Sequence, residues 1–278
     1  MILLAESGAS KTAWRIGTQQ TISYRWQGRG LNPSTLEKEA WLQELGQQLR
    51  LGADPAKIQE LHFYGAGLGQ AQRLKELQRY FAELLPNARL FLFDDLMAAV
   101  HAQMIPEGVV LIMGTGSNAA YFRNGEVIAR AGGLGYLLGD EGSGVDLGKE
   151  LLRGALMHGW RTGLQNRILD KLAGDRSSLI QKLYQSDHPA AHLAALARVV
   201  YEFVEEPEVE EMVILRFGRL LDSTATPLMK GKEMPVVAVG SIAHYFRTLL
   251  HKACEIRGLQ LGDVQQSPIN SLERRIWV

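Results

Sequence analysis

Residues 108–148 read GVVLIMGTGSNAAYFRNGEVIARAGGLGYLLGDEGSGVDLG, and the prediction of the fold starts from this stretch. Its apolar run at 109–113 is too short for a helix and too apolar for a loop, which predicts a buried strand. The turn that follows, residues 114–118, offers small residues, two hydroxyls and backbone N–H groups. These are the groups that bind phosphate in proteins, so the turn is a candidate phosphate site.

The second glycine-rich part of the stretch carries two adjacent carboxylates, Asp140 and Glu141, just before a helical pattern. Each part has a simpler explanation by itself. A tight hairpin would account for residues 114–118, and a loop with a helix cap would account for residues 140–144. Because both parts occur close together in one stretch, we prefer a binding function for them.

Composition excludes several classes of protein. The 278 residues suit one large or two modest domains, and 30 basic residues balance 30 acidic ones. A net charge of zero gives no electrostatic reason to expect nucleic acid or an anionic membrane as partner. Cys254 is the single cysteine, so one chain cannot build a disulfide, a four-cysteine zinc site or a cysteine-held iron–sulfur cluster. No apolar run approaches the ~20 residues that span a bilayer, and we expect a soluble, cytoplasmic protein.

A second candidate phosphate turn lies near the N-terminus. Apolar residues 2–5 lead into ESGASKT at 6–12 and then into AWRI at 13–16, which predicts strand, turn, strand. The GxxxxGK[ST] spacing of a Walker A loop is absent. A surface hairpin with incidental polar residues is the alternative.

The order of predicted elements repeats along the chain. The first half reads strand, strand, strand, helix, strand, helix, strand, helix, and the sequence Pro106-Glu107-Gly108 marks a boundary. After it the pattern restarts with three strands and a helix, and each half opens with strand, polar glycine turn, strand. This repetition indicates a duplicated architecture in which two phosphate turns face each other across a cleft.

Two further places carry candidate chemistry. Asp94 and Asp95 follow the predicted strand 89–93, where open α/β sheets bind ligands, although either could simply cap the next helix. Gly240 and Ser241 follow the strand predicted at 235–239, where a flat ring could approach the backbone or a helix could begin. The largely helical residues 159–230 carry no catalytic signal.

These segments together resemble the sugar kinases of the actin/Hsp70/hexokinase superfamily, and among them the N-acetylglucosamine kinase-like branch of the BadF/BadG/BcrA/BcrD ATPase family. The resemblance runs almost end to end, through LLAESGASKTAW, FYGAG, GTGSNAAYF, GGLGYLLGDEGSGVDLG, VVAVGSIAHYF and GLQLGDVQQSPINSL. It implies an α/β fold of two ribonuclease H-like (actin-like ATPase) domains, each with a mixed sheet flanked by helices, and an interdomain cleft. The implied domains are residues 1–106 and 107–278.

The resemblance also assigns roles. The general base matches Asp95 rather than Asp94, by its spacing to GVVLIMGTGSN and its DLMAA context. Glu6 stands where the family usually has Asp and would help to hold Mg²⁺, and Ala13 replaces the Asp of the TKTD motif. The other implied contacts are with the ATP phosphates (Ser7, Gly8, Ala9, Ser10, Lys11, Thr12, Gly114, Thr115, Gly116, Ser117), the adenosine (Gly240, Ser241) and the sugar (Asn32, Asn118, Gly133, Gly135, Asp140).

We therefore expect an ATP- and Mg²⁺-dependent amino-sugar kinase that phosphorylates N-acetylglucosamine at the 6-hydroxyl, with glucosamine and N-acetylmuramic acid as alternative substrates. The expected partners are the sugar and ATP, neither nucleic acid nor a membrane, and, where the chain self-associates, a homodimer. Three other hypotheses compete. The lone Cys254 disfavours an activator of a radical dehydratase, and the start of the chain at its first strand disfavours a sugar-responsive repressor. Glu6 and Ala13 are the residues that favour a nucleotide-binding sensor or weakened ATPase.

Overall fold

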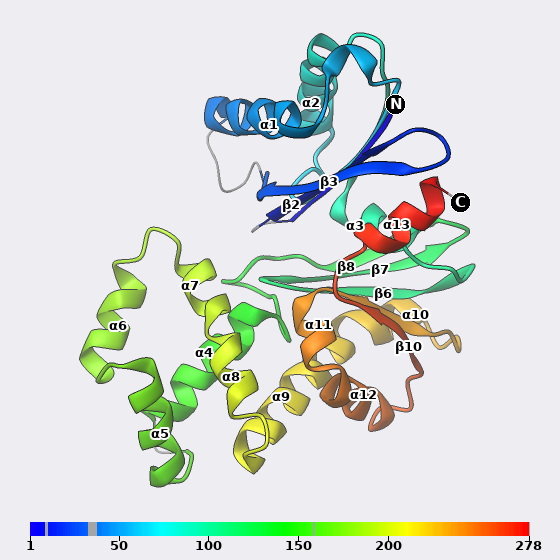
Figure 1. Ribbon diagram of the computed structural model, residues 1–278. Coiled ribbons are helices and arrows are strands. Elements are labelled where there is room, and N and C mark those ends of the chain that lie inside the picture. Colours follow the sequence, from blue (N-terminus) through cyan, green and yellow to red (C-terminus); the bar gives the residue numbers. More distant parts are fainter. Residues whose placement is uncertain (9–10, 33–37, 158, 278) are drawn as a thin grey trace. The chain divides into compact units, whose positions relative to one another are not determined.

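The computed structural model of the chain describes residues 1–8, 11–32, 38–157 and 159–277 (Figure 1). Contacts divide the chain into two compact units, one of Met1–Ile105 with Pro268–Val278 and one of Pro106–Ser267. We expected the second domain to run from 107 to 278. The residues from Pro268 onward instead belong with the first unit, because their helix packs into its core.

The first unit is built on a five-stranded mixed sheet in the order β3-β2-β1-β4-β5. Strands β1, β2 and β3 are antiparallel, whereas β4 and β5 run parallel to β1. The strands are β1 (Ile2–Ser7), β2 (Lys11–Gly17), β3 (Ile22–Arg29), β4 (Glu60–Gly65) and β5 (Arg89–Asp94). The helices are α1 (Lys38–Gly52), α2 (Ala71–Leu84), α3 (Asp95–His101) and α13 (Ile269–Ile276), with a short 3-10 turn at Pro55–Lys57.

Both faces of this sheet are buried, which is why strand β1 reads as a continuous apolar run. Successive side chains of a strand point to opposite faces. Leu3 and Ala5 lie in the core under α1 and α2, while Leu4 lies on the other face with residues of α3 and α13. Ile269 and Leu272 of α13 complete that second face, which explains why the C-terminal helix belongs to the first unit.

The second unit repeats the topology, with a five-stranded sheet in the order β10-β9-β6-β7-β8. Strands β6, β7 and β8 are antiparallel, whereas β9 and β10 run parallel to β6. The strands are β6 (Glu107–Met113), β7 (Ser117–Arg123), β8 (Glu126–Gly132), β9 (Val236–Val239) and β10 (Leu261–Gln265). The predicted fold class, α/β with two mixed sheets flanked by helices, is confirmed.

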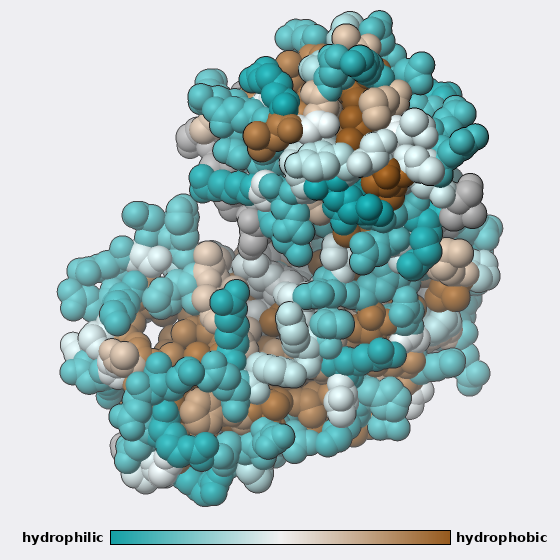
Figure 2. Space-filling view, viewed as in Figure 1, coloured by the Kyte–Doolittle hydropathy of each residue, from teal (hydrophilic) through white to brown (hydrophobic). Residues whose placement is uncertain are grey.

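Most of the helices that the structure describes belong to this second unit. They are α4 (Gly144–Leu156), α5 (Thr162–Leu172), α6 (Arg176–Tyr184), α7 (Pro189–Ala195), α8 (Ala197–Glu202), α9 (Pro207–Leu220), α10 (Thr226–Met229), α11 (Ser241–Tyr245) and α12 (Arg247–Glu255), with a π-helical turn at Leu221–Ala225. The face seen in Figure 2 is largely hydrophilic, with hydrophobic residues scattered over it. None of the helices described in the structure has the length and apolarity that crossing a lipid bilayer requires.

Candidate active site

The carboxyl edge of the first sheet brings the first turn and the aspartate pair together. Strand register places Ser7 opposite Thr12 on one side and Gly65 on the other, and Gly65 opposite Asp94. Neighbouring strands lie about 4.8 Å apart, so this row of four residues is about 14 Å long. The candidate phosphate turn and the candidate base therefore share one edge.

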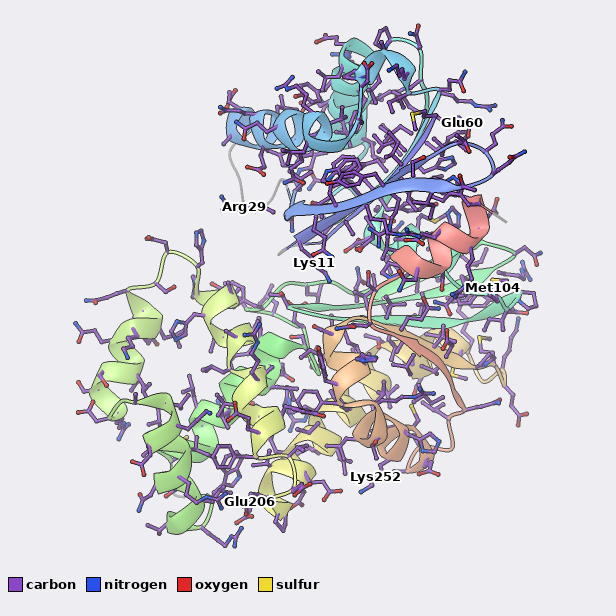
Figure 3. The ribbon with its side chains drawn as sticks, viewed as in Figure 1. Lys11, Arg29, Glu60, Met104, Glu206 and Lys252 are labelled. Carbon is purple, nitrogen blue, oxygen red and sulfur yellow. The ribbon has the colours of Figure 1, made fainter. Side chains whose placement is uncertain are left out.

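The first turn is closed by its backbone, since Gly8 N–H donates to the Lys11 carbonyl oxygen over 2.9 Å. Lys11, at the start of β2, pairs in register with Arg29 at the end of β3, and both side chains are exposed (Figure 3). Two cations directly opposite each other repel, which makes this corner suited to an anion. Ala9 and Ser10, which were also predicted to contact phosphate, lie outside the described residues.

Beneath this turn, two buried hydroxyls form a hydrogen-bonded chain whose direction is fixed. Thr12 Oγ1 donates to the Arg29 carbonyl over 2.8 Å, so its proton is not available to Ser7. Ser7 Oγ must therefore donate to Thr12 Oγ1, 2.8 Å away, while it accepts the N–H of Leu31 at 2.9 Å. Both hydroxyl protons are therefore used in hydrogen bonds within the protein. The phosphate contact predicted for Ser7 and Thr12 stays a prediction.

The same chain of hydrogen bonds holds the backbone just before Asn32, the predicted sugar contact. Leu31 is held on both sides, by Ser7 Oγ at its N–H and by Trp41 Nε1, which donates to its carbonyl over 2.9 Å. The buried amide of Gln48 supports the neighbouring Arg29 carbonyl through its Nε2 at 2.8 Å. Sequence reasoning missed Gln48 and Trp41, because no motif distinguishes them from ordinary residues of helix α1.

The two aspartates have different surroundings. Asp94, 6% exposed, is the N-cap of α3, and its Oδ1 accepts the N–H of Met97 over 2.9 Å. Asp95 is the first residue of the helix and is half-buried, with its Oδ1 3.1 Å from the N–H of Leu96. The capping alternative thus holds for Asp94. Catalysis by Asp95 stays a prediction.

Glu6 points to the same face of the sheet as Leu4, since it lies two residues further along β1. Its partner in register, Ala13, is buried against Leu4 and Tyr64, so an acidic side chain there would need a counterpart inside the core. Among the described residues, no three His, Cys, Asp or Glu side chains gather as metal ligands. Mg²⁺ commonly takes one or two carboxylates with phosphate oxygens and water, and the single carboxylate of Glu6 fits that donor set.

The second turn is supported by the start of helix α4. Gly144 N–H donates to the Gly114 carbonyl over 2.8 Å, and Val145 N–H donates to the Thr115 carbonyl over 3.1 Å. Ser117 Oγ donates to the Glu141 carbonyl over 2.8 Å. The two glycine-rich segments of residues 108–148 therefore form one structure, as their closeness in the sequence indicated.

Asp140 lies directly over this turn. Its Oδ1 accepts the N–H of Ser117 over 3.2 Å, and a Cβ added to Gly116 would come within 2.8 Å of its Oδ2. Burial raises the pKa of Asp140, and the hydrogen bond from Ser117 partly offsets that effect. Asp140 is held at φ +64°, a left-handed conformation that a non-glycine residue seldom adopts.

Of the other predicted sugar residues of this unit, Asn118 and Gly133 lie at the same turn, whereas Gly135 belongs to the loop that follows. A Cβ on Gly133 would lie 3.1 Å from Nδ2 of Asn118, so the two residues are in contact. The loop that follows is closed by Gly139 N–H, which donates to the Gly135 carbonyl over 2.9 Å, and by Lys149 Nζ, which donates to the Tyr136 carbonyl over 3.0 Å. The structure therefore brings Asn118, Gly133 and Asp140 to one place.

Packing alone explains why residue 240 is a glycine. Its φ is +130°, and a Cβ there would come within 2.1 Å of the Met113 carbonyl oxygen. This close approach of β9 to β6 demands glycine regardless of any ligand. Ser241 begins α11 with an exposed side chain, and the adenosine contact of the two residues stays a prediction.

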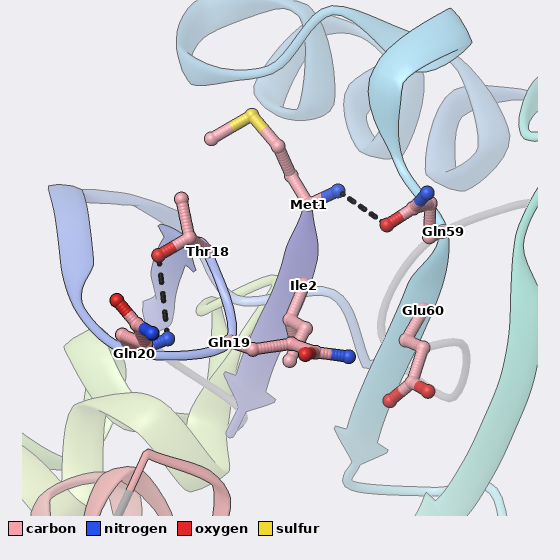
Figure 4. A pocket seen from close by; sticks show the side chains of 7 residues that line it. All are labelled: Met1, Ile2, Thr18, Gln19, Gln20, Gln59 and Glu60. Atoms are coloured by element: carbon pink, nitrogen blue, oxygen red, sulfur yellow. Dashed lines mark hydrogen bonds between the residues drawn. The ribbon is translucent and has the colours of Figure 1, made fainter.

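One pocket of the first unit lies elsewhere and contains none of the predicted site residues. Its walls are Met1, Ile2, Thr18, Gln19, Gln20, Gln59 and Glu60 (Figure 4). The N-terminal ammonium donates there to the Lys57 carbonyl over 2.8 Å and to Gln59 Oε1 over 3.3 Å. These bonds hold the chain terminus in place.

No protein-family model matches the chain. It is 32% identical over 209 residues to the N-acetylmuramic acid/N-acetylglucosamine kinase of Clostridium acetobutylicum, covering 70% of this chain and 68% of that protein. It is 44% identical to the N-acetyl-D-glucosamine kinase of Dictyostelium discoideum, over 69 residues that make up 22% of that protein.

Solved structures agree. A protein of Porphyromonas gingivalis assigned as an N-acetylglucosamine kinase superposes with a TM-score of 0.86 and 30% identity, over 99% of this chain and 98% of that one. A ROK family glucokinase of Streptomyces griseus, at 12% identity and a TM-score of 0.60 over 96% and 93% of the two chains, shares the fold alone. The fold is that of sugar kinases. The chain belongs to the family of N-acetylmuramic acid/N-acetylglucosamine kinases.

Proposed function

We propose that this protein is an ATP-dependent amino-sugar kinase that phosphorylates the 6-hydroxyl of N-acetylglucosamine, and that it belongs to the BadF/BadG/BcrA/BcrD ATPase branch. The observation that carries the proposal is the row Thr12, Ser7, Gly65, Asp94 at the carboxyl edge of the first sheet. Because of that register, a turn suited to phosphate and a half-buried carboxylate, Asp95, stand at the same edge.

Phosphoryl transfer requires positioning and charge stabilisation more than covalent catalysis. Asp95 accepts the proton of the sugar hydroxyl as the new O–P bond forms and the bond to the leaving ADP oxygen breaks. Lys11 and the backbone of the two turns bind the phosphates. Glu6 would help to hold Mg²⁺, which would supply neutralisation of the phosphate charge.

Asn32, Asn118 and Asp140 supply short polar groups of the kind that hydrogen-bond a neutral, hydroxyl-rich sugar. The scaffold holds the Asp140 carboxylate through Ser117 N–H, and it holds the backbone of Leu31, the residue before Asn32, on both sides. A preorganised site of this kind avoids part of the entropic cost of binding.

A coupled assay of ADP release tests the proposal, with N-acetylglucosamine, glucosamine, N-acetylmuramic acid and glucose as acceptors. We expect ADP release that depends on an amino sugar, and phosphorus NMR of the product should identify a 6-phosphate. Binding of ATP in a calorimeter without sugar-dependent ADP release would refute the kinase and leave the nucleotide-binding sensor.

A further inference from the structure

Helix α9 contributes an arginine, Arg216, to the interior of the second unit. This residue is not part of the predicted site. Arg216 makes a bidentate hydrogen bond to the carboxylate of Asp146, in which Nε donates to Oδ2 over 2.7 Å and Nη2 donates to Oδ1 over 2.8 Å. The Asp146 side chain is 3% exposed and that of Arg216 is 11% exposed. The ion pair is therefore inside the protein, between α9 and the first turn of α4.

Asp146 has a second partner that connects this pair to the glycine-rich loop. Its Oδ2 also accepts the N–H of Gly142 over 2.8 Å. Gly142 has φ +68° and Asp140 has φ +64°, so the loop contains two left-handed residues separated by one. Such a backbone is unfavourable for a side chain like that of Asp140 and persists only where the surroundings hold it.

Stability alone does not account for Arg216. Ser143 Oγ already caps α4 by accepting the N–H of Asp146 at 3.3 Å, and an acidic residue in a first helical turn is favourable without a partner. A buried ion pair is generally no more stabilising than apolar residues of similar volume. What the rigid guanidinium fork adds is a fixed plane for the carboxylate, and hence a fixed position for the Gly142 N–H.

We propose that Arg216 is a positioning residue for the sugar site. Through Asp146 and Gly142 it holds residues 140–143 in the conformation that places the Asp140 carboxylate over the second turn, against Ser117 N–H. This inference rests on the proposed function, because Asp140 is assigned to the sugar there. Among the described residues, Arg216 pairs with Asp146 and, at 4.0 Å, with Glu150, neither of which is a predicted ligand-binding residue, so its effect passes through the loop.

The chain offers a control with the same bond geometry at a more exposed position, where the Asp222 side chain is 56% exposed. Arg257 makes the same two-pronged bond to Asp222, with Nε to Oδ1 over 2.7 Å and Nη2 to Oδ2 over 2.8 Å, in the same unit. Arg257 lies beyond α12 and bonds to no residue of the glycine-rich loop. Arg216→Lys keeps the charge but loses the fork, Arg216→Met removes both, and Arg257→Met and Arg257→Lys are their controls.

Two measurements on the full chain are needed, namely steady-state kinetics for N-acetylglucosamine and ATP, and amide hydrogen exchange of the ligand-free protein over residues 138–144. For Arg216→Lys we expect at least tenfold faster exchange in that peptide and a sugar KM raised at least tenfold. The KM for ATP should stay within about threefold of wild type, because the bonds from Gly144 and Val145 still support the second turn. Both Arg257 variants should match wild type in all of these.

Exchange and sugar KM must change together for the inference to stand. It is overturned if the Arg216 variants behave like the Arg257 variants, if exchange rises without a change in sugar KM, or if KM rises with an unchanged loop. Should Arg216→Met fail to fold, Arg216→Lys carries the test. If the wild type shows no sugar-dependent turnover, the proposed function fails, whereas slow exchange that is insensitive to Arg216 would refute the positioning role independently.

Discussion

Ser7 Oγ and Thr12 Oγ1 lie 2.8 Å apart in the interior of the first unit, and the Arg29 carbonyl accepts the single proton of the Thr12 hydroxyl. This arrangement makes the two hydroxyls part of the support for the turn. It also links the strand that precedes the turn to Leu31 and so to Asn32.

Thr12→Val should lose this support while keeping the shape of the side chain. A buried group left without its hydrogen bond costs about 1–3 kcal/mol, so we expect the free energy of unfolding in urea to fall by that amount. The KM for the sugar should rise more than the KM for ATP, since the Leu31 clamp relaxes. Thr12→Ser retains the hydroxyl and should restore both, and the exposed Thr21→Val is the control. A Thr12→Val protein as stable as wild type would contradict the hydrogen-bonded chain.

Substitutions at two glycines of the second turn can distinguish a role in packing from a role in ligand binding. A Cβ on Gly116 would meet Asp140 Oδ2 at 2.8 Å, whereas a Cβ on Gly114 has nothing within 4 Å. Gly116→Ala should therefore lower the thermal midpoint of the ligand-free protein by several degrees, which corresponds to roughly 1–2 kcal/mol, and Gly114→Ala should leave it nearly unchanged.

Calorimetry with ATP then tests the phosphate role of that turn. If the backbone at Gly114 approaches a phosphate, Gly114→Ala should weaken ATP binding at least tenfold without loss of stability, because the new methyl group occupies the approach. Undiminished ATP affinity in Gly114→Ala would mean that the turn is purely structural.

The C-terminal helix provides a prediction about pH. Burial raises the pKa of Glu273, but hydrogen bonds from Arg15 and Arg25 outweigh it and leave the pKa lowered from its ordinary value of 4.5. A lowered folded-state pKa means that the stabilisation is present above pH ~4.5 and is lost as the pH falls through the folded-state pKa.

Glu273→Gln should therefore destabilise the protein by about 2 kcal/mol at pH 7, because it leaves the buried Arg15 poorly paired. The difference from wild type should shrink as the pH is lowered toward 3, measured by urea denaturation at each pH. The exposed Glu39→Gln is the control. A difference that stays constant over this range would exclude the ion pair as its cause.

The sequence allowed the fold class and the two glycine turns to be predicted because both depend on local pattern. Short apolar runs that end in small polar residues are typical of buried strands of α/β sheets, and β1 and β6 are of this kind. The distinction between Asp94 and Asp95 came from the family resemblance, through the spacing and context of Asp95, and the cap that Asp94 forms is consistent with it.

Features that depend on contacts between distant segments were not predicted. Glu273 and Arg15 are separated by 258 positions, and nothing in either segment indicates that α13 completes the first unit. Arg216 lies 70 positions from Asp146, in a helical region without any motif. Ser7 and Thr12 were assigned to the phosphates by the resemblance of the first turn to that of the sugar kinases, and that resemblance did not predict that alternation along the strands buries both side chains.

The central claim is that Asp95 is the general base of an amino-sugar kinase, and turnover of Asp95→Asn tests it most directly. The account predicts that kcat with N-acetylglucosamine falls by ~10²–10⁴ while the dissociation constant for ATP stays near that of wild type. Asp94→Asn is the matched control, because Asn caps a helix about as well as Asp, and it should retain most of the activity. An unchanged kcat in Asp95→Asn, or an equal loss in Asp94→Asn, would contradict the account.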